Sequence, residues 1–399
     1  MGKEGITMIY QYRFKNAWSF AEKTEVSFVL NHHVPETDSV FTTPRAVRLS
    51  KVMAVQGANG AGKTNVLRSL SFLGWFVARS FMGDRQASIK IRNHFFSDNT
   101  DSKLEMEFEH NGTHYRYLLV VNEKQVVHES LHEKTNRAFN YLFHRDLTAS
   151  GDYTIRQKGF HFIPTQAKRV RPNVSLISMA AQYNVPKAVQ LAGYFEKINT
   201  NVGPFKYVEK DIFNTADFFH RHPKLCRKMS KFMSQVDLGL SDVVIEMMPV
   251  SLEKIDELKA LPFGIHLKGR KRIVLPLWEE SEGTQTMFSI LQKILPALEH
   301  GGMVVLDELD AGLHPDMVMA LLELFTNTES NPNNAQIIFT SYVPDVMDTL
   351  LKEQILLVEK DPDGGYSQAW RLDDMKGIRR DENYYGKYRA GAYGATPNI

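Results

Sequence analysis

The feature that most constrains this 399-residue chain is the glycine-rich segment Gly57-Ala58-Asn59-Gly60-Ala61-Gly62-Lys63-Thr64. It follows the apolar run Val52–Gln56, which we predict to be a strand, and precedes a stretch of helical apolar spacing from Asn65 onward. A phosphate group binds in a tight cradle of backbone N–H groups, and side chains would block its approach. The segment therefore predicts a phosphate-binding loop, a P-loop, between a strand and a helix.

The P-loop pattern assigns different tasks to its side chains. Lys63 is expected to reach the β- and γ-phosphates of ATP and to assist catalysis, and the Thr64 hydroxyl is expected to bind Mg²⁺. The helix that begins near Lys63 would turn the positive end of its dipole toward the phosphates. The nucleotide-binding residues predicted in this segment are Gly57, Asn59, Gly60, Gly62, Lys63, Thr64 and Asn65.

A second motif is an apolar strand, Met303–Leu306, that ends in two carboxylates, Asp307 and Glu308. Alone, this pattern is equally typical of a solvated strand end. Together with a P-loop it indicates a Walker B element, in which Asp307 holds Mg²⁺ directly or through water. Glu308 would then polarise the attacking water as the catalytic carboxylate.

A third motif, Glu280–Gln285, precedes this strand and opens a predicted helix. A Ser-x-Gly sequence at a helix N-terminus can bind an anion, so we predict nucleotide contacts from Ser281, Gly283 and Gln285. The alternative is an ordinary capped helix. The segment Leu309–Pro315 follows the Walker B carboxylates, and its predicted nucleotide-site residues are Asp310 and His314.

The rest of the chain divides into three predicted domains: 1–145, 146–262 and 263–399. The first carries the P-loop and a small antiparallel sheet over about 104–143, where apolar residues alternate. The second is a largely helical insertion. The third restores the α/β pattern and ends in a hairpin and an aromatic tail. The helices predicted in the insertion are Val174–Gln182, Pro186–Ile198 and Thr215–Val236.

Composition limits the environment and the partners of the chain. Hydrophobic residues make up 43% and charged residues 24%, which excludes a disordered chain or a coiled-coil rod. The formal net charge is only +2, so any nucleic-acid contact must come from local basic runs, which are otherwise solvated faces. The single cysteine, Cys226, favours a reducing, cytoplasmic location. No apolar run predicts a membrane span.

The order of these motifs resembles that of ABC-type ATPases of the SMC/RecF-like branch. More narrowly, the chain resembles the RloA/AbiLi group of bacterial AAA-family ATPases and, at greater distance, PtuA-like proteins. The segments that carry the resemblance are Phe14–Asn16 with Phe20, Gly57–Thr64, Tyr115–Tyr117 with Glu129–Leu131, Ser281–Thr284, Asp307–Asp310 with Leu313–Pro315, Val358–Lys360, Tyr388–Gly391 and Tyr393–Ala395.

The resemblance implies an ATP-dependent homodimer or higher homo-oligomer. Ser281 and Gly283 of one head would lie over the γ-phosphate bound by the other. Proteins of this group are commonly encoded beside a nuclease or Toprim-like effector in anti-phage defence operons, where the ATPase serves as sensor, scaffold or brake. Two alternatives stay open: a DNA-repair or recombination ATPase that binds DNA through its basic insertion, and a scaffold that binds ATP without needing hydrolysis.

One position departs from the family pattern. The predicted strand Ile337–Thr340 is followed by Ser341 and Tyr342, where ABC-type heads usually carry a switch histidine. A tyrosine can donate a hydrogen bond, but it cannot carry an imidazole proton near neutral pH. We therefore expect hydrolysis slower than about 1 s⁻¹, an ordinary enzyme rate, unless Tyr342 is a tolerated substitution. A Q-loop is not placed, although Arg92–Phe96 is a candidate segment.

Overall fold

A computed structural model describes residues 7–136, 138–203, 211–236, 239–251 and 254–396. Its centre is a six-stranded sheet in the order β12-β16-β17-β6-β18-β19. Neighbouring strands are parallel except for the final pair, a β18–β19 hairpin. The strands are β12 (Ile198–Thr200), β16 (Met303–Leu306), β17 (Gln336–Thr340), β6 (Val52–Gln56), β18 (Ile355–Lys360) and β19 (Ser367–Arg371).

The three middle strands, β16, β17 and β6, are buried at every residue. This burial explains their continuous apolar sequences, because a parallel strand is covered on both faces. The strands predicted at Val52–Gln56 and Met303–Leu306 are confirmed with the same bounds. The predicted C-terminal hairpin is also confirmed.

A seven-stranded antiparallel sheet, ordered β11-β10-β9-β8-β7-β1-β2, lies beside the central sheet. The predicted sheet over 104–143 is confirmed but is larger, because it includes the N-terminal strands. Its strands are β1 (Thr7–Lys15), β2 (Thr24–Ser27), β7 (Ser102–His110), β8 (Thr113–Val121), β9 (Val126–Thr135), β10 (Ala138–Leu147) and β11 (Tyr153–Gln157). A small sheet of β3 (Val29–Leu30), β5 (Arg48–Ser50) and β4 (Val40–Thr42) adjoins it.

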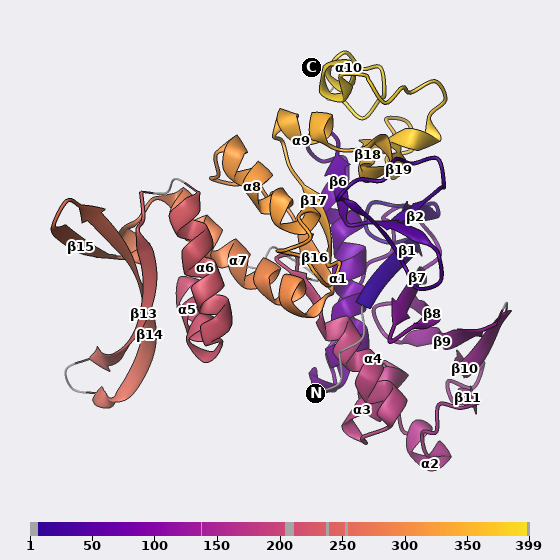
Figure 1. Cartoon of the computed structure of the whole chain (residues 1–399). Coiled ribbons are helices and arrows are strands. Elements are labelled where there is room, and N and C mark those ends of the chain that lie inside the picture. Colours follow the sequence, from indigo (N-terminus) through magenta and orange to yellow (C-terminus); the bar gives the residue numbers. More distant parts are fainter. Residues whose placement is uncertain (1–6, 137, 204–210, 237–238, 252–253, 397–399) are drawn as a thin grey trace.

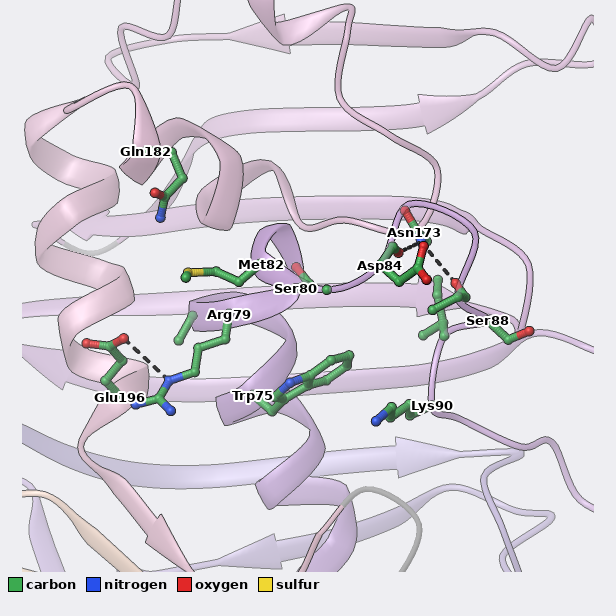
Figure 2. A pocket seen from close by; sticks show the side chains of 14 residues that line it. Trp75, Arg79, Ser80, Met82, Asp84, Ser88, Lys90, Asn173, Gln182 and Glu196 are labelled. Carbon is green, nitrogen blue, oxygen red and sulfur yellow. Dashed lines mark hydrogen bonds and ion pairs between the residues drawn. The ribbon is translucent and has the colours of Figure 1, made fainter. Parts of the chain in front are cut away.

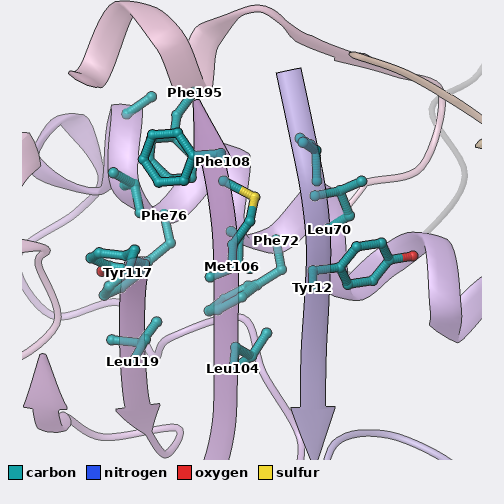
Figure 3. Packing of buried hydrophobic residues seen from close by; sticks show 14 of the residues in the cluster. Tyr12, Leu70, Phe72, Phe76, Leu104, Met106, Phe108, Tyr117, Leu119 and Phe195 are labelled. Carbon is teal, nitrogen blue, oxygen red and sulfur yellow. The ribbon is translucent and has the colours of Figure 1, made fainter. Parts of the chain in front are cut away.

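Helix α1 (Lys63–Arg79) joins the two large sheets through one apolar core. Figure 3 shows Phe72 and Phe76 of α1 among Met106, Phe108 and Tyr117 of the antiparallel sheet. The same cluster contains residues of the central sheet, including Met53, Val55 and Ile338, which are fully buried. Each such side chain contributes about 1.5–3 kcal/mol on burial, so the helix that follows the P-loop is held rigidly.

The predicted insertion, 146–262, contributes to two different cores. Helices α2 (Pro164–Ala167), α3 (Leu176–Gln182) and α4 (Pro186–Glu196) belong to the first core, and both α3 and α4 contact α1. Helices α5 (Ile212–Arg221) and α6 (Pro223–Gln235) belong to a second core with α7 (Glu282–His300). The division of the chain at 146 and 262 stays a prediction.

Two features of this segment differ from the sequence analysis. The single helix predicted over Thr215–Val236 is wrong, because His222 leaves the helical conformation and Pro223 starts a new helix without an N–H to donate. A three-stranded sheet of β13 (Asp242–Ser251), β14 (Lys254–Lys268) and β15 (Lys271–Pro276) was not predicted over most of its length. Figure 1 shows this sheet projecting to one side with α5 and α6.

The C-terminal part covers the other face of the central sheet. Helix α7 confirms the helix predicted to open at the third motif, and α8 (Pro315–Thr326) continues the α/β pattern predicted for this part of the chain. Tyr384 and Tyr393 of the aromatic tail are buried in the second core, so the tail packs on its own head. In the part of the chain that the structure describes, the remaining helices are α9 (Pro344–Thr349), α10 (Tyr384–Arg389) and the 3₁₀ turns η1 (Ser80–Met82), η2 (Leu277–Glu279), η3 (Lys352–Gln354) and η4 (Leu372–Asp374). Within the described ranges, no helix has the length and apolarity to cross a bilayer.

Candidate functional site

The P-loop connects the buried end of β6 to the first turn of α1. Two of its glycines are required by close packing on the β18–β19 hairpin. A Cβ at position 57 would lie 2.1 Å from the carbonyl oxygen of Val358, and a Cβ on Gly62 would lie 2.4 Å from Ser367 Oγ. Gly60 has open space around it. The hairpin therefore fixes the shape of the loop while the middle of the loop stays accessible.

The predicted P-loop and Walker B residues line one cavity of about 440 Å³. Its lining consists of Ala58, Asn59, Gly60, Gly62, Lys63, Thr64, Asn65, Asp307, Glu308, Thr340 and Tyr342. Residues from three separate parts of the chain meet here because β6, β16 and β17 are neighbours in the sheet and all end at the same edge. Gly57 lies at the start of the loop, outside the lining.

Lys63 is nearly buried at the base of this cavity, with 7% of its surface exposed. Its ammonium group donates hydrogen bonds to the carbonyl oxygens of Gly57 (2.7 Å) and Ala58 (3.1 Å). It also donates to the hydroxyl oxygen of Tyr342 at 3.0 Å. The lysine is thus folded back on its own loop, and a bound phosphate would compete for its protons.

Thr64 and Asp307 also line the phosphate cavity, and their side chains are hydrogen-bonded to each other. The Thr64 hydroxyl donates to Asp307 Oδ2 at 2.7 Å, and the Thr340 hydroxyl donates to Asp307 Oδ1 at 2.6 Å. A hydroxyl beside a carboxylate is the kind of oxygen pair that Mg²⁺ accepts, with phosphate and water oxygens completing its shell. The donor set therefore fits the predicted Mg²⁺, with Thr64 and Asp307 as its protein ligands.

Glu308 follows in the left-handed region, with φ of 51°. A non-glycine residue in this conformation costs about 1–2 kcal/mol, and such strain is concentrated at functional sites. The backbone is held there because the Glu308 N–H donates to Thr340 Oγ1 at 2.7 Å. Glu308 lines the cavity beside Asp307, as a catalytic carboxylate would require.

Several residues that support the site were missed by sequence reasoning. Asn201 clamps the Walker B backbone, since its side chain accepts from Asp307 N–H at 2.8 Å and donates to Asp307 C=O at 2.9 Å. Asn65 donates to Ser19 Oγ at 2.8 Å, and Ser19 in turn accepts a hydrogen bond from Ser367. Asn65 was predicted as part of the P-loop segment, but Asn201, Ser19 and Ser367 belong to no local motif. Only the strand order, which places β12 beside β16, brings Asn201 to this edge.

The predicted signature residues, which are Ser281, Gly283 and Gln285 of the third motif, lie outside the phosphate cavity. Ser281 is the N-cap of α7, and its Oγ accepts a hydrogen bond from Thr284 N–H at 3.2 Å. Gly283 is packed so closely on the segment after Walker B that a Cβ would lie 2.8 Å from Gly312 O. Gln285 donates to the carbonyl oxygen of Glu280 at 2.8 Å. None of the three predicted residues lines the phosphate cavity of the same chain.

The remaining predicted positions lie next to the cavity or outside it. Asp310 Oδ2 accepts a hydrogen bond from Tyr342 N–H at 3.0 Å, which ties the segment after Walker B to the switch position. His314 caps α8 by accepting from Asp316 N–H. In the candidate Q-loop segment, His94 is buried whereas Phe95 and Phe96 are exposed. That segment contributes nothing to the cavity lining.

A second cavity, of about 660 Å³, lies at the opposite end of α1. Figure 2 shows its wall, where Arg79 reaches Glu196 and Lys90 lies near the Trp75 ring. The Arg79–Glu196 separation is 3.5 Å, so the arginine is already neutralised. No predicted nucleotide residue lines this cavity, and we assign it no role.

The sheet order, the P-loop, the Thr64–Asp307 pair and the serine-capped helix before the Walker B strand define an α/β ABC-type P-loop ATPase head with an antiparallel β-subdomain. Residues 52–341 match the family described as "AAA domain, putative AbiEii toxin, Type IV TA system", and the chain belongs to this family. It is thus an ABC-type, nucleotide-binding ATPase.

Solved structures similar to the chain include three SMC heads. One is the SmcHead bound to the C-winged helix domain of ScpA, with 14% identity, TM-score 0.47, and coverage of 93% of this chain and 99% of that chain. The SMC head domain from Thermotoga maritima has 15% identity, TM-score 0.43, and coverage of 91% and 98%. The Smc head domain with a coiled coil and joint from Pyrococcus yayanosii has 10% identity, TM-score 0.48, and coverage of 96% and 100%. The comparison with curated proteins gave no match.

Proposed function

We propose that this protein is a cytoplasmic ATPase that binds ATP between two copies of its head and hydrolyses it slowly. The observation that carries the proposal is the composition of the phosphate cavity. It combines Lys63, Thr64, Asp307 and Glu308, yet it has no contribution from Ser281, Gly283 or Gln285. A second head would supply those groups, and ATP would favour association because the γ-phosphate makes contacts only in the closed state.

The chemistry follows from the positions of the side chains. The P-loop amides and Lys63 would hold the β- and γ-phosphates, and Thr64 with Asp307 would hold Mg²⁺. When bound, Mg²⁺ would neutralise charge that develops on the phosphate oxygens. Glu308 would orient the attacking water. Tyr342 stands where an imidazole would otherwise assist, so we expect turnover below about 1 s⁻¹ without a partner.

We further propose that the protein senses or restrains a nuclease or toxin effector in anti-phage defence, as in the RloA/AbiLi group. Two features support this assignment. The family description names a toxin–antitoxin system, and the segments Tyr115–Tyr117 and Tyr388–Gly391 resemble that group. A neighbouring reading frame of nuclease or Toprim type would be the direct partner.

A phage challenge of cells that carry the gene and its neighbours tests this role. If ATP binding matters more than turnover, Lys63→Ala should abolish protection, whereas Glu308→Gln should retain it. Plaque counts measure both, with Lys360→Ala as an exposed lysine control. Protection by Lys63→Ala would contradict a nucleotide-dependent role. Loss of protection with Glu308→Gln would show that hydrolysis is required.

A second candidate function is contact with nucleic acid. The chain has three basic runs, at 168–171, 221–231 and 268–272, and one of them favours this function. In the first run, Arg171 donates to backbone carbonyls of Phe81 and Gly83. In the second run, Lys224 and Lys228 form ion pairs with Glu299 and lower its pKa to about 2.

The third run lies at the β14–β15 turn, where the exposed cations are Lys268, Arg270, Lys271 and Arg272. Among the described residues these four have no ion-pair partner.

If the β14–β15 turn binds a phosphate backbone, replacing its four cations by glutamine should weaken DNA binding strongly. The slope of log affinity against log salt should fall by about 3 to 4, because each phosphate contact contributes about 0.9. Fluorescence anisotropy with a short duplex at several salt concentrations measures this slope. A control variant replaces four exposed lysines elsewhere, Lys23, Lys103, Lys124 and Lys360. Equal loss in both variants would indicate attraction by net charge alone.

A further inference from the structure

Tyr342 lines the phosphate cavity and contacts the P-loop. Its hydroxyl accepts a hydrogen bond from Lys63 Nζ at 3.0 Å and donates one to Asn59 Oδ1. The Lys63 ammonium also lies 4.6 Å from the centre of the Tyr342 ring. The ring therefore covers the two P-loop side chains nearest the expected γ-phosphate.

Tyr342 also separates two cavities. It lines the phosphate cavity and an adjoining cavity of about 900 Å³, and Ala58 and Asn59 are shared by both. The C-terminal tail lines this adjoining cavity, the tail cavity, through Tyr385, Tyr388 and Arg389. Because about half of the Tyr342 surface is exposed, the side chain has room to turn from one cavity into the other.

We propose that Tyr342 is a γ-phosphate-gated switch that reports bound ATP to the C-terminal tail. The proposal rests on the ATP binding proposed above. A phosphate is a stronger acceptor for the Lys63 ammonium than a neutral hydroxyl, because the anion adds a direct attraction between opposite charges to the hydrogen bond. ATP would therefore displace the tyrosine hydroxyl. ADP has no γ-phosphate. Its β-phosphate would take Lys63 protons that are now donated to the carbonyl oxygens of Gly57 and Ala58, so the Tyr342–Lys63 contact would stay in place.

The backbone of Tyr342 is anchored during this change. Its N–H donates to Asp310 Oδ2 at 3.0 Å, so the side chain would move by rotation about χ1 into another staggered position. The tail cavity contains a buried hydrogen-bond donor that could bind the displaced hydroxyl, the side-chain amide of Gln56. Gln56 is 94% buried there, given 6% exposure, and its amide nitrogen has no hydrogen-bond partner among the described residues. The displaced hydroxyl oxygen would give this donor an acceptor, which favours the turned position because a buried donor without a partner is costly.

Entry of the Tyr342 ring into the tail cavity would change the contacts of the C-terminal tail, because the tail is hydrogen-bonded to the P-loop. The carbonyl oxygen of Ala395 accepts from Ala58 N–H at 3.0 Å and from the Tyr388 hydroxyl at 2.9 Å. Burial and, next, the nearby Tyr342 raise the pKa of Tyr388 to about 12, so its hydroxyl stays protonated and continues to donate. A ring that enters beside Tyr388 must shift these contacts. The surface formed by α10 would then differ between the ATP and ADP states.

Nucleotide affinity tests the first half of the proposal. Tyr342→Phe removes the hydroxyl that competes for Lys63, so the Kd of the β,γ-imido analogue of ATP should fall about three- to tenfold, as for loss of a partly exposed charged hydrogen bond. The Kd of ADP should change less than about twofold. Tyr183→Phe, at a similarly exposed tyrosine remote from the cavity lining, is the control. Equal changes for both nucleotides, or no change for either, would overturn the proposal.

Amide hydrogen exchange of residues 384–396 tests the second half. In the unmodified protein the ATP analogue should increase exchange in this segment, and ADP should not. Tyr342→Ala should bind the analogue but lose the difference, because no ring enters the tail cavity. Equal exchange with both nucleotides in the unmodified protein would contradict the switch. If the unmodified protein binds neither nucleotide, the proposed function itself is wrong rather than the switch alone.

Discussion

Replacing Lys63 by alanine is expected to weaken ATP binding by at least about 100-fold. Among the described residues, Lys63 supplies the one cation in the lining of the phosphate cavity. Its ammonium group is nearly buried, so the contacts it makes are little screened by solvent. Losing charge-assisted hydrogen bonds to two phosphates costs about 3 kcal/mol or more, which corresponds to this change in Kd. Isothermal titration calorimetry with the β,γ-imido analogue of ATP measures the loss directly.

Two matched variants show whether the loss reflects the phosphate contact. Lys63→Arg keeps the positive charge but cannot place a compact ammonium in the same space, so it should also bind weakly. Lys360→Ala removes an exposed lysine near the end of β18 and should bind like the unmodified protein. Thermal unfolding should be cooperative in all three variants. A Lys63→Ala variant that binds ATP within about tenfold of the unmodified protein would contradict the assignment of this cavity.

The central part of the site was predictable because its signals are local in the sequence. The P-loop, its flanking strand and helix, and the strand ending at Asp307 each occupy one continuous segment, and continuous apolar runs give buried parallel strands. The supporting residues were not predictable. Asn201 and Ser19 touch the site only because strands far apart in sequence become neighbours, and their sequence surroundings carry no motif.

The errors in the insertion have a similar physical cause. The segment before β13 has apolar spacing that suits one long helix, but Pro223 removes a backbone donor and divides it. Strand β14 was missed because its alternation is interrupted by Pro262 and Gly264. A Cβ at Gly264 would lie 2.5 Å from Glu280 Oε1 and 2.8 Å from Leu240 Cδ2, so the strand packs closely on these side chains. Packing against the residues before α7 thus stabilises a strand here, although the local alternation of apolar residues does not predict one.

A negative charge at position 281 is expected to abolish ATP-dependent association while leaving ATP binding intact. Ser281 caps α7 and lies outside the phosphate cavity of its own chain. Aspartate is an equally good N-cap, so Ser281→Asp should keep the helix folded. In a two-head sandwich, however, its carboxylate would face the γ-phosphate bound by the partner. Analytical ultracentrifugation with ATP, in a Glu308→Gln background that slows hydrolysis, should show the monomer for Ser281→Asp.

Ser281→Asn is the matched control, because asparagine also caps a helix but carries no charge; it should associate more strongly than Ser281→Asp. Mixing variants then decides whether the site is shared. A Lys63→Ala head keeps an intact signature, and a Ser281→Asp head keeps an intact phosphate cavity. Neither variant should associate alone, but their mixture can form one complete ATP site between unlike heads. Association in the mixture would establish completion by the second head, whereas its absence, together with normal association of Ser281→Asp alone, would show that the serine only caps α7.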